Sequence, residues 1–320
     1  MAVYTGVDPD DLAALVARYH IGTVLSCKGI AEGVENSNFL LETTAGRFIL
    51  TLYEKRVKVE ELPFFVDLLA HLAASGCAVP PMIRDRDGLA IQRISDRAAC
   101  IIQFLPGISL NHPTPGQCAS AGAALGGMHG ALANYAGGRD NSMGHRHWRA
   151  IAEATGDLDA VRPGLAAIVG DELDYLDAHW PTDLPAHVIH ADLFPDNVLM
   201  LGDRVTGLID FYFAATDFRA YDVAVTHASW TFSADGTLCD DARAKALMRG
   251  YASAITLSDT EQAALPLLAR GASLRFLLTR AHDWVHTPAD ALVTRKDPSP
   301  FLERLRRYQA ADADSLFAAA

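Results

Sequence analysis

The stretch 188-VIHADLFPDNVLM-200 sets a histidine, two aspartates and an asparagine between two apolar, strand-like runs. Segments this apolar are normally buried, and a buried carboxylate is costly unless it is paired or bound to a cation. His190, Asp192 and Asn197 follow the spacing H-x-D-x-x-x-x-N, and Asp210 comes later in "LIDF". The stretch therefore predicts a polar loop held rigid by flanking strands and serving a chemical site.

This residue set matches the needs of phosphoryl transfer. A carboxylate must orient the acceptor hydroxyl and take its proton, while a second carboxylate and an amide oxygen hold Mg²⁺ against the nucleotide phosphates. A short hairpin through residues 201–203 is expected to bring Asn197 and Asp210 side by side. "FPDN" alone would usually be a turn, but its combination with Asp192 and Asp210 favours catalysis.

Length and composition limit the class of protein. The 320 residues are enough for two lobes, and half of them are apolar. The net charge of −12 works against binding to a phosphate backbone, so no nucleic-acid partner is expected. Five widely spaced cysteines without a CxxC motif argue against a disulfide framework or a zinc site and favour a reducing cytosol. No signal-peptide pattern and no long apolar run is present, so we expect a cytoplasmic protein without a membrane partner.

The first hundred residues are predicted to be rich in strands. A helix should begin at Pro9 with Asp8 as its N-cap, and a second helix should cover 60–76. A hairpin is expected with strands at 39–41 and 48–53. A further hairpin is expected within 80–94, with its turn at Asp87-Gly88, and a strand within 98–107.

After Gly107 the pattern becomes helical. Alanine-rich tracts predict helices at 121–135, 165–180, 242–255 and 261–284, with two short strands at 188–189 and 205–209. The expected fold class is α+β and bilobal. A small β-rich lobe covers 1–103, a hinge covers 104–107, and a large, mostly helical lobe covers 108–320.

The motif "HADLFPDNVLM", followed by "GLIDFYFAATDFRAYDVA", resembles the catalytic core of protein-kinase-like folds in the form found in aminoglycoside-phosphotransferase-like kinases. Within that superfamily, segments 29–56, 60–72 and 275–284 resemble the homoserine kinases. The resemblance runs in order through nearly the whole chain. It implies a protein-kinase-like fold and ATP- and Mg²⁺-dependent phosphorylation of L-homoserine to O-phospho-L-homoserine, on the route to threonine.

The resemblance also implies roles for individual residues. Asp192 corresponds to the catalytic base, and Asn197 and Asp210 to the metal-binding pair. His190 corresponds to a histidine that packs beneath the loop, and Asp222 to a buried aspartate that braces it. A plain helix N-cap is the alternative for Asp222.

Nucleotide contacts are implied in the first lobe. The hairpin that covers the phosphates corresponds to 29–38, and backbone groups of the hinge would bond the adenine. The candidate residues are Gly33, Asn36, Ser37, Asn38, Gln103, Phe104 and Leu105.

Position 51 departs from the protein-kinase pattern. Aligning "FILT" with the strand that carries a lysine in protein kinases puts Thr51 at the lysine position. Threonine cannot neutralise phosphate charge. Lys28, Lys55 or Arg56 could do so, and strand alternation alone does not choose among them.

The acceptor pocket is expected on the helix "SLRFLLTRAHDW", which sets charged side chains into an apolar frame. An amino-acid acceptor calls for an arginine and an acidic partner. The alternative is that Arg275 and Asp283 pair structurally with neighbours. The candidates are Arg275, Arg280, Asp283 and Trp284, with Tyr212, Asp217 and Arg219 as further possible lining residues.

Other functions remain open from the sequence. The acceptor could be an aminoglycoside, a choline-like alcohol or another hydroxylated metabolite, and Thr51 raises the alternative of a catalytically inactive nucleotide-binding protein. His145 and His147 in "GHRHWR" lack further metal ligands, which favours a solvated loop. "GGMHG" lacks the Lys-Ser/Thr ending of a phosphate loop, which favours close helix packing. The oligomeric state is not determined by the sequence.

Overall fold

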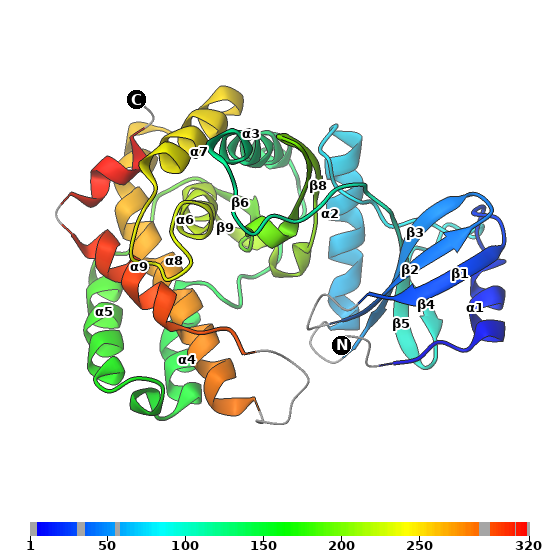
Figure 1. The fold of residues 1–320 in the computed structure, drawn as a ribbon, viewed down its shortest axis with the longest axis horizontal. Helices are drawn as coiled ribbons and strands as arrows, with labels where there is room; N and C mark the ends of the chain where they lie inside the picture. The colour runs from blue at the N-terminus through cyan, green and yellow to red at the C-terminus, as the bar shows by residue number, and fades with distance from the viewer. Residues whose placement is uncertain (1–4, 31–35, 55–57, 288–294, 311, 319–320) are drawn as a thin grey trace. The chain divides into compact units, whose positions relative to one another are not determined.

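The computed structural model describes residues 5–30, 36–54, 58–287, 295–310 and 312–318. They divide into two compact units, and the chain passes from one to the other between Pro106 and Gly107. Strands dominate the first unit and helices the second (Figure 1). The expected α+β fold class is confirmed, whereas a hinge at 104–107 remains a prediction.

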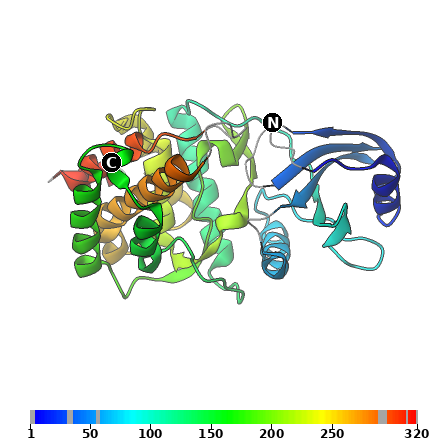
Figure 2. The ribbon, with the colours of Figure 1, turned by 90° about the horizontal axis from the view of Figure 1, so that it is seen from below.

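The first unit is built on a five-stranded antiparallel sheet in the order β1-β2-β3-β5-β4. The long strands β1, β2 and β3 lie side by side (Figure 2). The hairpin expected around 39–53 is confirmed as β2 and β3. The strands are β1 (Val24–Gly29), β2 (Asn36–Thr43), β3 (Gly46–Tyr53), β4 (Gln92–Ile94) and β5 (Arg97–Gln103).

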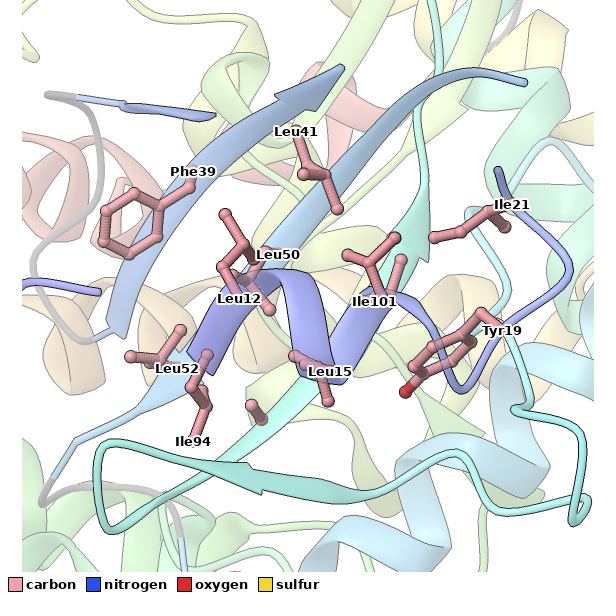
Figure 3. Close-up of a cluster of buried hydrophobic side chains, with 12 residues drawn as sticks. Leu12, Leu15, Tyr19, Ile21, Phe39, Leu41, Leu50, Leu52, Ile94 and Ile101 are labelled. Atoms are coloured by element: carbon pink, nitrogen blue, oxygen red, sulfur yellow. The ribbon is translucent and has the colours of Figure 1, made fainter. Parts of the chain in front are cut away.

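Helix α1 (Pro9–Val16) covers one face of this sheet. Its N-cap is Asp8, as predicted, and the Asp8 carboxylate accepts from the backbone N–H of Asp10 at 2.8 Å. Leu12 and Leu15 pack against side chains that include Leu50 and Ile101 (Figure 3). Because successive strand residues point to opposite faces, this core takes every second residue of β2, β3 and β5.

The predicted hairpin with its turn at Asp87-Gly88 is wrong. Residues 85–89 do form a turn, in which Gly88 N–H donates to Asp85 O at 3.0 Å. The buried Asp85 carboxylate, however, accepts from Leu89 N–H and Gln92 Nε2, and these bonds hold the segment as a loop. The β4–β5 hairpin instead turns at Ser95 and Asp96. The helix expected at 60–76 is confirmed as α2 (Leu62–Ala74), preceded by the short helix η1 (Val59–Glu61).

The second unit has α6 at its centre, surrounded by other helices (Figure 1). Every residue from Ala220 to Ala228 is buried. The α helices are α3 (Pro115–Leu132), α4 (Trp148–Thr155), α5 (Leu165–His179), α6 (Arg219–Trp230), α7 (Asp241–Ala254), α8 (Asp259–His286) and α9 (Ser299–Gln309). The short helices are η2 (His145–His147), η3 (Leu158–Ala160), η4 (Pro195–Asn197), η5 (Phe211–Phe213) and η6 (Ala313–Phe317). None of these or the other described helices has both the length and the apolar character of a membrane span.

Glycines allow α3 and α7 to approach closely. A Cβ atom on Gly250 would collide with the carbonyl oxygen of Ala119, and one on Gly122 with that of Leu247. Gly126 lies against Tyr251 O in the same way. The close packing expected for the glycine-rich tract is therefore present.

Four short strands form two antiparallel pairs in this unit. β6 (Ala186–Ile189) pairs with β9 (Ala215–Phe218), and β7 (Val198–Leu201) forms a hairpin with β8 (Arg204–Leu208). The two strands expected at 188–189 and 205–209 are both present, but in different pairs. The polar loop 190–197 connects β6 to β7.

Candidate active site

The loop after β6 is held from beneath by Asp222 of α6. The two Asp222 oxygens accept the backbone N–H groups of His190 and Ala191, each at 2.8 Å. Burial by itself raises the pKa of Asp222, but His129 and the other donors outweigh it and keep the pKa below its ordinary value. The N-cap alternative does not apply, because Phe218 occupies that position of α6.

His190 links the loop to the end of β8. The ring is fully buried, and this burial lowers its pKa. Nε2 lies 3.0 Å from Ile209 O, and Nδ1 accepts the backbone N–H of Asp192 at 3.3 Å. These contacts require a neutral imidazole with its proton on Nε2.

The Asp192 carboxyl lies partly buried beside Asn197. Asn197 Nδ2 donates to the Asp192 carbonyl oxygen at 2.8 Å and to its carboxyl Oδ2 at 3.2 Å. Burial raises the pKa of Asp192 to about 8, although the positive charge of Arg275 opposes the change. A carboxyl poised in this range is suited to proton transfer near neutral pH.

The β7–β8 hairpin places Asn197 beside Ile209, the residue before Asp210. Val198 pairs with Leu208, and Ile209 N–H donates to Asn197 O at 3.0 Å. Asp210 and Ala191 both have left-handed backbone angles, with φ of 63° and 62°. Such strain in non-glycine residues concentrates at functional sites.

Asn197 and Asp210 fit the requirements of Mg²⁺. The amide nitrogen of Asn197 is engaged with Asp192, whereas no described group donates to its Oδ1. Asp210 is exposed at the end of β8. Amide and carboxylate oxygens are ligands that Mg²⁺ prefers. Among the described residues no group of three or more His, Cys, Asp or Glu forms a metal cluster, so phosphate oxygens and water would have to complete the coordination.

Two supporting residues were missed by the sequence analysis. His129 of α3 lies with Nε2 3.0 Å from Asp222 and Nδ1 2.9 Å from the Tyr251 hydroxyl. His129 thus holds Asp222 in place, and Tyr251 supports His129 from a third helix, α7. A histidine inside an alanine-rich tract was the signal available in the sequence, but its partners lie far away in the chain.

Arg275, expected as an acceptor ligand, supports the loop instead. It is only 2% exposed, and Nη1 donates to Ala191 O. The loop residue Ala191 is thus held on its N–H side by Asp222 and on its carbonyl side by Arg275. A burial this complete leaves the guanidinium out of reach of a substrate.

The predicted nucleotide contacts in β2 point to opposite faces of the sheet. Asn38 Oδ1 accepts from the Thr51 hydroxyl at 2.7 Å. Ser37 points the other way, is fully buried and donates to Glu54 at 2.8 Å, so strand alternation separates it from Asn36 and Asn38. Gly33, Lys55 and Arg56 lie outside the described residues.

Two further positions near the expected nucleotide site are defined by the register. Lys28 pairs with Leu40, which places it on the Thr51 face of the sheet. Gln103 ends β5, and its N–H donates to Pro81 O at 3.1 Å, so only its carbonyl could bond an adenine through the backbone. Phe104 and Leu105 follow it as partly exposed residues outside any helix or strand.

Comparison with known proteins identifies the family. A sequence profile described as "Phosphotransferase enzyme family" matches residues 26–257. The chain belongs to this family.

Its relatives within the family include homoserine kinases. It is 51% identical to the homoserine kinase of Xanthobacter autotrophicus, with 98% of both chains covered. It is 50% identical to that of Methylorubrum populi, again with 98% of both covered. The chain therefore belongs to the homoserine-kinase branch of the phosphotransferase family.

Solved structures of this phosphotransferase type share the fold. An amicoumacin kinase in complex with AMP-PNP, Ca²⁺ and amicoumacin superposes with a TM-score of 0.70 at 15% identity, covering 96% of this chain and 93% of that one. A microcompartment-associated aminopropanol kinase gives a TM-score of 0.70 at 20% identity, covering 97% and 100%. The kinase-like fold expected from the motif is confirmed.

The remaining acceptor candidates of this phosphotransferase differ in their contacts. Arg280, Asp283 and Trp284 are partly exposed on α8, at spacings that place them on one face. Trp284 carries the guanidinium of Arg295 over its ring at 4.9 Å. Tyr212 lies in η5, and its carbonyl oxygen accepts from Arg139 at 3.4 Å.

Three residues considered as lining or loop positions serve other contacts. Arg219 forms an ion pair with the buried Glu261, with Nη2 at 2.6 Å from Oε2. Asp217 accepts from Asn141 Nδ2 at 2.6 Å. The solvated loop expected around His145 is wrong for that residue, because its ring stacks on Trp180 at 4.8 Å and its Nε2 lies 2.8 Å from Asp177.

Proposed function

We propose that the protein transfers the γ-phosphoryl group of ATP to the side-chain hydroxyl of L-homoserine, giving O-phospho-L-homoserine on the route to threonine. The observation that supports the reaction is the braced loop with Asp192 beside the Asn197–Asp210 pair. The acceptor is supported by relatives that are about half identical over almost the whole chain and are named homoserine kinases.

In this mechanism Asp192 accepts a hydrogen bond from the homoserine hydroxyl and takes its proton. The hydroxyl oxygen forms a bond to the γ-phosphorus as the bond from that phosphorus to the β–γ bridging oxygen breaks, which releases ADP. Asn197 and Asp210 would hold Mg²⁺, which would supply positive charge to the phosphates. His190, Asp222, His129 and Arg275 keep the Asp192 backbone fixed, so that no reorganisation is needed during transfer.

ATP would be held by residues of the first unit. The strand residues Asn36 and Asn38, Gly33 and the backbone of 103–105 are the proposed contacts, with 104–107 as hinge. Ser37 would support the strand through Glu54. A cytoplasmic location is part of this proposal and agrees with five cysteines that are all free.

A coupled ADP-release assay tests the function. With ATP and Mg²⁺, L-homoserine should be turned over far faster than L-serine, choline or an aminoglycoside, and ³¹P NMR should show a phosphomonoester on the homoserine oxygen. Turnover of another alcohol without homoserine turnover would contradict the acceptor. Absence of phosphoryl transfer to every alcohol would support the inactive nucleotide-binding alternative, which the intact Asp192, Asn197 and Asp210 argue against.

A further inference from the structure

We propose that Arg280 binds the α-carboxylate of the acceptor and thereby selects an amino-acid alcohol over a simple amino alcohol. This inference rests on the proposed homoserine kinase function and assigns one residue to its specificity. Arg280 lies on α8, five residues after the buried Arg275. The structure distinguishes these two arginines, which the sequence pattern does not.

An aromatic layer places Arg280 beside the catalytic loop. Phe194, within the loop, packs edge-on against Phe276 with ring centroids 4.8 Å apart. Phe276 stacks on Phe301 at 5.1 Å. The guanidinium carbon of Arg280 lies 4.5 Å from the centroid of Phe301. Arg280 is therefore held by the same side chains that support the loop.

A second connection runs through residues 296 and 297. Arg280 Nη1 donates to Asp297 O at 3.1 Å. The neighbouring Lys296 lies with Nζ 3.6 Å from Oδ2 of Asp196, which belongs to the catalytic loop. Burial lowers the pKa of Arg280, while the charges of Asp196, Asp192 and Asp297 act in the opposite direction. The guanidinium is thus within the electrostatic field of the proposed base.

Arg280 also keeps donors available. A guanidinium has five N–H donors, and Asp297 O is the one hydrogen-bond partner of Arg280 within the described part of the chain. Arg275 is almost fully buried and donates to Ala191 O, and Arg139 donates to two carbonyl oxygens of residues 212–214. A carboxylate is the group that a planar guanidinium binds best, through two parallel hydrogen bonds.

Homoserine carries its carboxylate a few bonds away from its hydroxyl. Its carboxyl carbon lies roughly 5 Å from its hydroxyl oxygen in an extended conformation, as bond lengths of about 1.5 Å imply. On this proposal, an acceptor whose hydroxyl lies at Asp192 extends its carboxylate to Arg280. 3-Aminopropan-1-ol has the same hydroxyl and amine but lacks the carboxylate. With that acceptor the partly desolvated guanidinium would lose its partner, which is a strong source of discrimination.

The test compares the two acceptors in Arg280 variants. For Arg280→Gln, kcat/KM for L-homoserine should fall about 10- to 100-fold, the range expected for a lost charged hydrogen bond, and mainly through KM. The kcat/KM for 3-aminopropan-1-ol should change little, so the ratio of the two kcat/KM values, which measures the preference for homoserine, should fall by the same factor. Arg280→Lys keeps the positive charge but cannot make two parallel hydrogen bonds to a carboxylate. Its kcat/KM for L-homoserine should therefore lie between those of the wild type and Arg280→Gln. Arg295→Gln is the matched control, because Arg295 is exposed and donates to Trp284 O, and its preference should match that of the wild type.

The outcomes separate this inference from the function it rests on. If the wild type does not phosphorylate homoserine, the proposed function fails and this inference fails with it. If the wild type does so and a folded Arg280→Gln keeps the same preference between the two acceptors, the inference alone is wrong. Should Arg280→Gln not fold, Arg280→Met preserves packing on Phe301 without the charge, and an unchanged preference in that variant would equally overturn it.

Discussion

Asp192 has its backbone held by contacts on several sides. The N–H of Asp192 is bonded to His190, its carbonyl and one carboxyl oxygen accept from Asn197, and the preceding Ala191 is held by Asp222 and Arg275. The carboxyl of Asp192 is thereby oriented while burial raises its pKa. These are the conditions under which one carboxylate can act as a general base.

Replacing Asp192 by Asn should lower kcat by a factor of about 10² to 10⁴, the usual contribution of a general base. The KM for ATP should change little, since the variant keeps the size and shape of the side chain. Steady-state kinetics at saturating Mg²⁺ measures both. Asp203→Asn, in the exposed turn between β7 and β8, is the control and should behave as the wild type. If Asp192→Asn keeps the kcat of the wild type, Asp192 is not the general base.

Asn197→Ala should raise the Mg²⁺ concentration needed for half-maximal activity, by roughly 10- to 100-fold as for other changes at metal sites. The amide oxygen is lost as a ligand, while Asp210 remains. Initial rates over a range of free Mg²⁺ at fixed ATP give the shift. A variant with a lower kcat but the wild-type Mg²⁺ curve would show that Asn197 acts only through its hydrogen bonds to Asp192.

At the scale of elements, several helices converge on one loop. α6 supplies Asp222, α3 supplies His129 and α8 supplies Arg275, whereas α7 supplies Tyr251 behind His129. The packing of α3 against α7 therefore determines where His129 stands. Glycines at the contact allow the helix backbones to meet, so a small change there should reach the loop.

Gly250→Ala should lower the free energy of unfolding by about 1–3 kcal/mol, the usual cost of overpacking. The added Cβ would meet Ala119 O, a backbone atom that can move only with its helix. Gly127→Ala on α3 is the matched control, because no atom lies within 4 Å of its Cβ position, and it should be neutral or stabilising by up to about 1 kcal/mol. Urea unfolding followed by fluorescence measures both, since all four tryptophans lie in the second unit. Equal stabilities of the two variants would contradict the close contact.

At the scale of the whole molecule, the end of the chain is tied to its central helix by His227. This buried residue of α6 lies with Nδ1 2.7 Å from the Tyr308 hydroxyl of α9 and Nε2 3.0 Å from Leu316 O of η6. The neutral ring accepts at Nδ1 and donates from Nε2. Burial lowers the pKa of His227 to about 4, below the ordinary value of about 6.5 that it regains on unfolding.

The protein should therefore lose stability in mild acid through this residue. The pKa of His227 is lower in the folded state than in the unfolded state. Its contribution to the free energy of unfolding is therefore complete above pH 6.5 and is lost as the pH falls towards 4. Each pH unit in that window corresponds to about 1.4 kcal/mol, or about 3 kcal/mol in total. Urea unfolding of the wild type and of His227→Gln between pH 4 and 7.5 measures the effect as the difference between their curves. Parallel curves would show that His227 does not titrate on unfolding.

Much of the fold could be predicted because its signals are local. The N-cap at Asp8, the β2–β3 hairpin and the helix at 62–74 each depend on residues a few positions apart. The prediction of a hairpin at Asp87-Gly88 was wrong because the buried carboxylate of Asp85 holds that segment as a loop. The burial of Asp85 is not visible in the local sequence pattern. His145 was misassigned in a similar way, because Trp180 comes to it from 35 positions along the chain.

The sequence by itself determined the reaction type, because Asp192, Asn197 and Asp210 flank one short hairpin and their spacing is visible along the chain. Only the tertiary structure decided what stands around that loop. The bonds from Asp222 and Arg275 to Ala191 span 31 and 84 positions, and that from His129 to Asp222 spans 93. Whether an arginine of α8 supports the loop or is available to an acceptor depends on how deeply its side chain is buried. That burial results from the packing of several helices, and the sequence of α8 alone does not determine it.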